Sequence, residues 1–214
     1  FTLGIVAVYR MGAFVPSPGV DYPAVQQCLA AGNAQGGLYS FVNMFSGGAL
    51  LQVSIFALGI MPYITASIIV QLLRVVIPRF EALHKEGASG TAKLTQYTRY
   101  LTIGLGVLQA TTIITLVRSG NFFVGCTLEL VPDQSIPTLL LMVMTMTVGT
   151  VLIMFMGEMI TERGVGNGMS LLIFTSIIAT FPGSLWAIQQ REGRWDIFFL
   201  VIAIGLLIIA AVVF

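Results

Sequence analysis

The sequence contains 52 consecutive residues without a charged side chain, between Asp21 and Arg74. Four further uncharged stretches cover residues 100–117, 134–157, 164–190 and 197–214. A helix of about 20 apolar residues crosses the roughly 30 Å hydrocarbon core of a bilayer. Continuous apolar runs without polar alternation favour helices over a membrane β-barrel. The pattern therefore predicts an all-α, polytopic membrane protein.

Composition excludes two other classes of protein. Hydrophobic residues make up 57% of the chain, charged residues 9%, and the mean hydropathy is +0.94. A soluble globular domain carries roughly a quarter charged residues, and a disordered chain carries few apolar ones. The formal net charge of +1 provides no basic field, so we expect no direct nucleic-acid readout. Because both ends are apolar and no Met begins the chain, we interpret it as an interior part of a longer membrane protein.

The apolar runs predict a helical bundle with six spans and one shorter piece. The block 41–77 is too long for one span and too short for two spans with a turn, and Gly47 and Gly48 lie near its start. Half-length structure at membrane depth is tolerated where protein or a water-filled cavity surrounds it. We therefore expect a re-entrant half-helix at about 41–53. The predicted spans cover about 1–15, 54–76, 100–117, 136–156, 169–189 and 197–214.

The distribution of basic residues predicts the orientation of the bundle. One side carries Arg74, Arg79, Lys85, Lys93, Arg99 and Arg163, and the other carries Arg118, Arg191 and Arg194. Cytoplasmic loops of membrane proteins are enriched in Lys and Arg. The charged loop 77–99 and the start of the chain are therefore predicted to be cytoplasmic, and the re-entrant piece to enter from outside.

Few residues suit catalysis or metal binding. His84, the single histidine, lies in the charged loop and is interpreted as a solvated residue rather than a ligand. Glu158 and Glu162 are expected to pair with neighbouring Arg163 in a short turn. No paired carboxylates lie within the predicted spans. We therefore expect no enzyme activity, no metal and no cofactor.

Two other polar features have structural explanations. Arg10 is the one charge within a predicted span, and packing or snorkelling of its side chain is favoured. The sequence GVGNG at 164–168 resembles a phosphate-binding loop superficially, but no strand precedes it and no Lys follows. A tight turn capped by Asn167 is the better interpretation.

The two cysteines, Cys28 and Cys126, both fall in loops that are predicted to lie on the outer side of the membrane, opposite the cytoplasm. Disulfides persist in such compartments. A disulfide between them is therefore one alternative. Two unpaired thiols are the other, because loop cysteines often lie too far apart to be joined.

Five stretches together resemble a known family. They are YRMGAFVPSPGVD at 9–21, NMFSGGAL at 43–50, FALGIMPYITASIIVQLL at 56–73, TQYTRY at 95–100, and GE at 157–158 with ITERGVGNG at 160–168. In this order they are similar to the bacterial SecY family, which forms the pore of the general protein-secretion translocon. The resemblance covers the whole chain and implies the amino-terminal half of a pseudo-symmetric channel.

The resemblance implies roles for individual residues. The re-entrant piece corresponds to the plug that closes the channel, here including Asn43, Phe45, Ser46, Gly47 and Gly48. The pore-ring positions correspond to Ile60, Ile64 and Ile173, and the polar lateral-gate positions to Thr65 and Gln109. Arg79, Lys85, Lys93, Arg99 and Arg163 are candidates for cytoplasmic contacts.

The function implied is a passive conduit in the bacterial cytoplasmic membrane. It would carry secretory polypeptides across the bilayer and release membrane segments sideways into lipid. The implied partners are SecE, SecG, the ATPase SecA, the ribosome, and the translocating polypeptide with its signal sequence. A narrow ring of branched apolar side chains would resist ions while yielding to a polypeptide.

Two other functions remain open at the level of sequence. A small-solute secondary transporter also uses broken helices, but it needs polar or ionisable groups near the membrane midplane. A purely structural membrane scaffold needs neither a half-helix nor a cavity.

Overall fold

The computed structural model describes residues 1–30, 46–119, 130–133, 135–164 and 166–192, together with Phe199 and Ala203. The described part is helical, and its single bridge in extended conformation joins Pro16 to Ser54. Its helices are α1 (Thr2–Gly12), α2 (Tyr22–Ala30), α4 (Met61–Val76), α5 (Pro78–Lys85), α6 (Ala88–Arg118), α7 (Ile136–Arg163) and α8 (Gly168–Glu192). The all-α membrane fold predicted from the sequence is confirmed.

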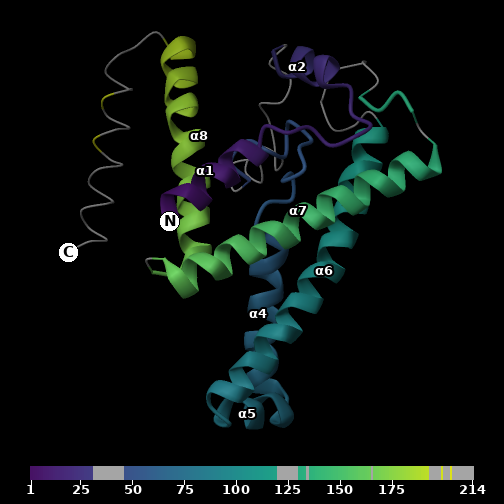
Figure 1. Ribbon diagram of the computed structural model, residues 1–214. Coiled ribbons are helices and arrows are strands. Elements are labelled where there is room, and N and C mark those ends of the chain that lie inside the picture. The colour runs from purple at the N-terminus through teal and green to yellow at the C-terminus, as the bar shows by residue number, and fades with distance from the viewer. Residues whose placement is uncertain are drawn as a thin grey trace.

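Two long helices form the frame of the molecule. Ser89–Arg118, within α6, and Ile136–Arg163 are each long and apolar enough to cross a membrane. Threonines along α6, such as Thr98 and Thr102, donate to the carbonyl four residues earlier, which satisfies their hydroxyls within the helix. In Figure 1, α6 descends beside α4, while α7 crosses both and leads to α8.

The chain bends by 99° between α4 and α5. Ile77 is extended, with φ −104° and ψ 114°, and Pro78 follows it as the first residue of α5. A proline disfavours helical geometry in the residue before it and lacks the amide that would continue the helix. If this bent pair counts as one span, the described residues contain up to three candidate spans.

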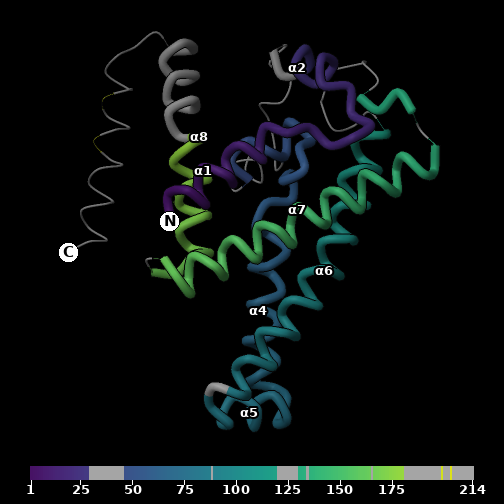
Figure 2. Tube along the Cα trace, in the orientation of Figure 1, coloured from purple at the N-terminus to yellow at the C-terminus, as the bar shows by residue number. Residues whose placement is uncertain are grey.

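The region between α1 and α4 differs from the sequence prediction. Residues 46–60, called the inserted segment below, form successive turns, and α4 begins at Met61 rather than near position 54. Gly47, Gly48, Val53 and Gly59 all have positive φ, which a right-handed helix does not allow. The predicted half-helix is thus a coil of turns over 46–53, and residues 41–45 lie outside the described part. Figure 2 traces this segment between α1 and α7.

The inserted segment packs against two apolar clusters. Leu50, Val53 and Ala57 contribute to the first, with residues of α2, α6 and α7. Ala49, Phe56 and Ile60 contribute to the second, with residues of α1, α7 and α8. The non-helical inserted segment therefore has protein on two sides. Irregular backbone within a membrane is tolerated where protein surrounds it in this way.

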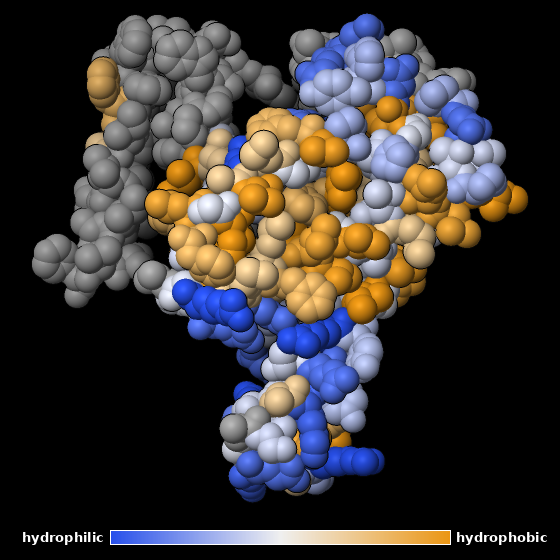
Figure 3. Space-filling model, in the orientation of Figure 1, coloured by the Kyte–Doolittle hydropathy of each residue, from blue (hydrophilic) through white to orange (hydrophobic). Residues whose placement is uncertain are grey.

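The surface divides into an apolar body and a polar projection. Hydrophobic side chains gather over α1 and the middle of α7, whereas the projection formed by α5 and the start of α6 is mainly hydrophilic (Figure 3). Residues 77–99, called the polar stem below, are the loop that the sequence predicted to be charged. The stem is helical, since α6 already begins at Ala88.

The remaining predicted spans have different outcomes. The first, 1–15, contains the eleven-residue α1, and the fifth, 169–189, lies within α8. The helix at 136–163 extends beyond the predicted 136–156. Apart from Phe199 and Ala203, the last predicted span, 197–214, lies outside the described residues. The six-span topology therefore stays a prediction.

Candidate functional site

The three isoleucines singled out from the sequence belong to one apolar cluster. Ile60 is buried within it, and Ile64 and Ile173 pack against it partly buried. Ile60 and Ile64 share a face because they stand four residues apart, and the amide of Ile64 donates to the carbonyl of Ile60 at 3.1 Å. The fold thus brings residues from the start of α4 and from α8 to one place, although Ile60 and Ile173 are 113 positions apart.

The start of α8 fixes the position of Ile173. The side-chain oxygen of Asn167 accepts from the amides of Met169 and Ser170 at 3.0 and 3.4 Å. Such a bond satisfies amides that the first turn of a helix leaves unpaired. The predicted capping role of Asn167 is confirmed.

Beside these isoleucines lies a cavity of about 450 Å³. Tyr63, Ile64 and Ser67 line it from α4, and Met169 and Ile173 line it from α8. Arg99, Glu158 and Glu162 supply charge on the remaining walls. The lining of this cavity thus combines apolar side chains with charged and polar ones.

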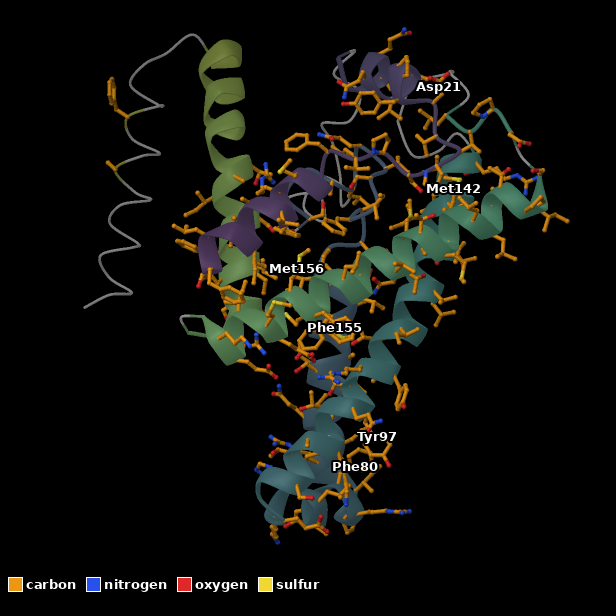
Figure 4. The ribbon with its side chains drawn as sticks, in the orientation of Figure 1. Asp21, Phe80, Tyr97, Met142, Phe155 and Met156 are labelled. Atoms are coloured by element: carbon orange, nitrogen blue, oxygen red, sulfur yellow. The ribbon has the colours of Figure 1, made fainter. Side chains whose placement is uncertain are left out.

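Arg99 and Glu158 form a two-pronged ion pair on the cavity wall. Nε donates to one carboxylate oxygen at 2.9 Å and Nη2 to the other at 2.7 Å. The guanidinium also lies over the ring of Phe155, 5.8 Å from its centroid, which is within the roughly 6 Å of a cation–π contact. In Figure 4, Phe155 lies where α7 crosses α4.

This ion pair corrects one sequence-based prediction. Glu158 pairs with Arg99 of α6 rather than with Arg163. The Arg99 side chain is 40% exposed, and its role as a cytoplasmic contact stays a prediction. The sequence carried an overlooked signal: Arg99 precedes one apolar run and Glu158 follows the next, so antiparallel spans bring them to the same side.

The plug positions are described only in part. Asn43 and Phe45 lie outside the described residues, and Ser46, Gly47 and Gly48 begin the inserted segment. The hydroxyl of Ser46 accepts from the amide of Leu50 at 3.0 Å. Nη1 of Arg10 donates to the carbonyl of Gly47 at 2.7 Å, so Arg10 does more than pack or snorkel.

Thr65 and Gln109 lie on neighbouring helices that pack together, α4 and α6. The hydroxyl of Thr65 donates to the carbonyl of Met61 in its own helix at 3.0 Å. Both side chains are partly buried, and among the described residues no hydrogen bond joins them. Their gate role stays a prediction.

The candidate cytoplasmic residues are mostly exposed. Lys85 and Lys93 form exposed ion pairs with Glu81 and Glu86 at 2.6 and 3.7 Å. Phe80 of α5 and Tyr97 of α6 contact each other within the stem, with ring centroids 5.5 Å apart (Figure 4). Arg79 and Arg163 lie at the exposed ends of α5 and α7.

Two loop predictions concern single residues. His84 is exposed, as expected for a solvated residue, and its Nδ1 lies 3.2 Å from Nη1 of Arg74. Cys28 is buried in the first apolar cluster beside Leu130 and Val131, and it is disulfide-bonded. Cys126 lies outside the described residues, so its pairing with Cys28 stays a prediction.

Comparison with known proteins decides the family. The SecY family model matches residues 54–214, three quarters of the chain. The chain belongs to the SecY family. Its SecY relatives are each named protein translocase subunit SecY. That of Micrococcus luteus is 69% identical over 214 residues, and that of Streptomyces scabiei is 60% identical over 219. That of Mycobacterium tuberculosis is 57% identical over 216 residues.

The SecY comparisons also define what part of the family's fold is present. All of this chain aligns with each of these relatives, but it covers 49% or 50% of their length. The chain thus spans about half the length of the curated relatives it matches.

Proposed function

We propose that this chain forms half of a protein-conducting channel, in which Ile60, Ile64 and Ile173 contribute to the constriction. The single observation that carries the proposal is their meeting in one apolar cluster, beside a cavity with polar walls. A hydrophobic constriction sheds water and so resists ions. Residues 46–53 of the inserted segment belong to the plug, and Thr65 and Gln109 belong to the lateral gate.

The direction of transport follows from the charge distribution. The polar stem faces the cytoplasm, the start of the chain lies on the same side, and secretory polypeptides enter the cavity from there. The membrane is the bacterial cytoplasmic membrane. SecE, SecG, the ATPase SecA, the ribosome and a signal-sequence-bearing polypeptide are the partners, of which SecA or the ribosome drives transport. Arg79, Lys85 and Lys93 are the stem's contact residues.

The channel acts as a passive conduit. The paired Arg99 and Glu158 line the entrance and neutralise each other, so Glu162 supplies the remaining charge of the described lining. A conduit that passes many sequences benefits from weak attachment.

Ion leakage tests the proposal. The full-length protein, assembled with its partners in planar bilayers, is compared with variants carrying Ile60→Ser, Ile64→Ser or Ile173→Ser. Each variant should raise the resting ion current, because a hydroxyl holds water in the constriction. Ile178→Ser is the matched control, since Ile178 lies on α8 outside the cluster and is 51% exposed.

Two outcomes would contradict the channel. If all three variants show the same resting current as Ile178→Ser, these isoleucines do not form a constriction. If the same substitutions change the uptake of a small solute but leave polypeptide transport unchanged, the protein is a secondary transporter instead.

A further inference from the structure

The start and the middle of the inserted segment are held by different kinds of bond. Near its middle, the amide of Ser17 donates to the carbonyl of Val53, and the amide of Ile55 donates to the carbonyl of Val15, both at 3.0 Å. These backbone bonds tie positions 53–55 to the connection after α1. They form a bridge that no side-chain motion releases.

At position 47 the attachment is a side chain. Nη1 of Arg10 donates to the carbonyl of Gly47 at 2.7 Å, and the Arg10 guanidinium lies 5.4 Å from the centre of the Phe14 ring. Arg10 forms no ion pair among the described residues. Its charge, half-buried in an apolar body, therefore depends on this carbonyl and on an aromatic face.

The contact at Gly47 is closely fitted. A Cβ at this position would lie 2.8 Å from Nη1 of Arg10 and 3.4 Å from the Cα of Ser176. The φ of Gly47 is +68°, which glycine adopts without strain. Tyr9, next to Arg10, donates to or accepts from Ser176 at 2.7 Å. The Arg10 contact thus lies beside a hydrogen bond that joins α1 to α8.

We infer that Arg10 is a positioning residue that latches the plug in its seat, with 53–55 as the hinge about which residues 47–52 swing. The inference rests on the proposed function, because a plug has a role only in a channel. Opening breaks this charge-assisted bond, exposes the buried Ala49 and Leu50, and leaves the backbone bridge intact. The strength of the bond therefore contributes to how readily a signal sequence opens the channel.

Labelling of a buried thiol tests the latch. Ala49→Cys is introduced into the full-length protein in its complete translocase, since Ala49 is fully buried in the second cluster. A membrane-impermeant maleimide then reports how often this segment leaves its seat, with the parent protein correcting for the natural cysteines. Arg10→Gln should accelerate labelling about tenfold, the change expected from losing one hydrogen bond to a charged group. Transport of a precursor with a defective signal sequence should rise in parallel.

Controls separate the latch from a general effect on folding. Arg10→Lys keeps a charged donor and should restore most of the protection. Met11→Gln changes the neighbouring, exposed residue of α1 and should leave labelling unchanged. Gly47→Ala, which displaces Arg10 without removing it, should also accelerate labelling and provides the test if Arg10→Gln does not assemble.

Labelling of Arg10→Gln and Gly47→Ala at the parent rate would overturn the latch. If the Ile60, Ile64 and Ile173 variants still leak in that case, the channel stands and only the latch is wrong. If those variants do not leak either, both the latch and the proposed channel function are wrong.

Discussion

The inserted segment and the polar stem contrast in what holds them. Contacts from distant parts of the chain fix the inserted segment: the rings of Tyr9 and Phe56 stack at 5.9 Å, and the carbonyl of Ile55 lies against α7. Local and exposed contacts within 77–99, such as Lys85 with Glu81, stabilise the stem. The segment with the least regular backbone is therefore the more tightly packed of the two. Irregular backbone here therefore goes together with close packing rather than with a loose loop.

The close approach of α7 to the backbone of the inserted segment should give the largest effect. A Cβ on Gly149 of α7 would lie 2.2 Å from the carbonyl oxygen of Ile55. Gly149→Ala should therefore destabilise the full-length protein by about 1–3 kcal/mol, the usual cost of overpacking. Thermal unfolding of the purified translocase, followed by size-exclusion chromatography, measures this.

Gly104 supplies the matched control, because no atom lies within 4 Å of a Cβ built there. Gly104→Ala should be neutral or slightly stabilising, since alanine favours a helix. Equal destabilisation by both substitutions would show that the packing of the inserted segment against α7 is not tight.

The ion pair between Arg99 and Glu158 lies where the stem meets the body and should give an intermediate effect. A double-mutant cycle with Arg99→Gln and Glu158→Gln should yield a coupling of about 1 kcal/mol, the upper range for a partly exposed pair with good geometry. The cycle is measured by the same thermal unfolding at low salt. A variant with the two charges exchanged, Arg99→Glu with Glu158→Arg, should recover part of the lost stability. A coupling energy of zero would show that the ion pair does not contribute to stability.

The exposed pair of Lys85 and Glu81 should give the smallest effect. The hydrogen bond and positive charge of Lys85 lower the pKa of Glu81 from its ordinary value of 4.5. A lowered pKa means that the pair stabilises the stem above that ordinary value, and that this contribution is lost as pH falls through the folded pKa. Lys85→Gln should return the pKa of Glu81 towards 4.5, as measured by carbon-13 NMR of labelled glutamate, without shifting the unfolding temperature. An unchanged pKa would show that the pair is not formed in solution.

The sequence predicted the parts that depend on local signals. Uncharged runs located α6 and α7, and Asn167 was predicted as the cap of a tight turn, where the structure shows it bonded to the first amides of α8. The start of α4 was predicted seven residues early, because an apolar run is equally compatible with helix and with buried turns. Positive φ at Val53 has no signal in the sequence.

The candidate site was predictable from motif positions but not from chemistry. Each isoleucine alone is typical of any membrane helix, and only resemblance to a family singled out Ile60, Ile64 and Ile173. The partners of Arg10 and Glu158 depend on how α1, the inserted segment and α6 pack, which pairs residues 37 and 59 positions apart. Such distant pairs are fixed by tertiary packing rather than by sequence spacing.

Crosslinking from within the constriction tests the central claim most directly. A photoreactive residue is placed at position 64, 173 or 178 of the full-length protein, and a secretory polypeptide is halted midway through the assembled translocase. Crosslinks to the halted polypeptide should form from 64 and 173 but not from 178. Equal crosslinking from all three positions, or none from 64 and 173, would contradict a constriction at this cluster.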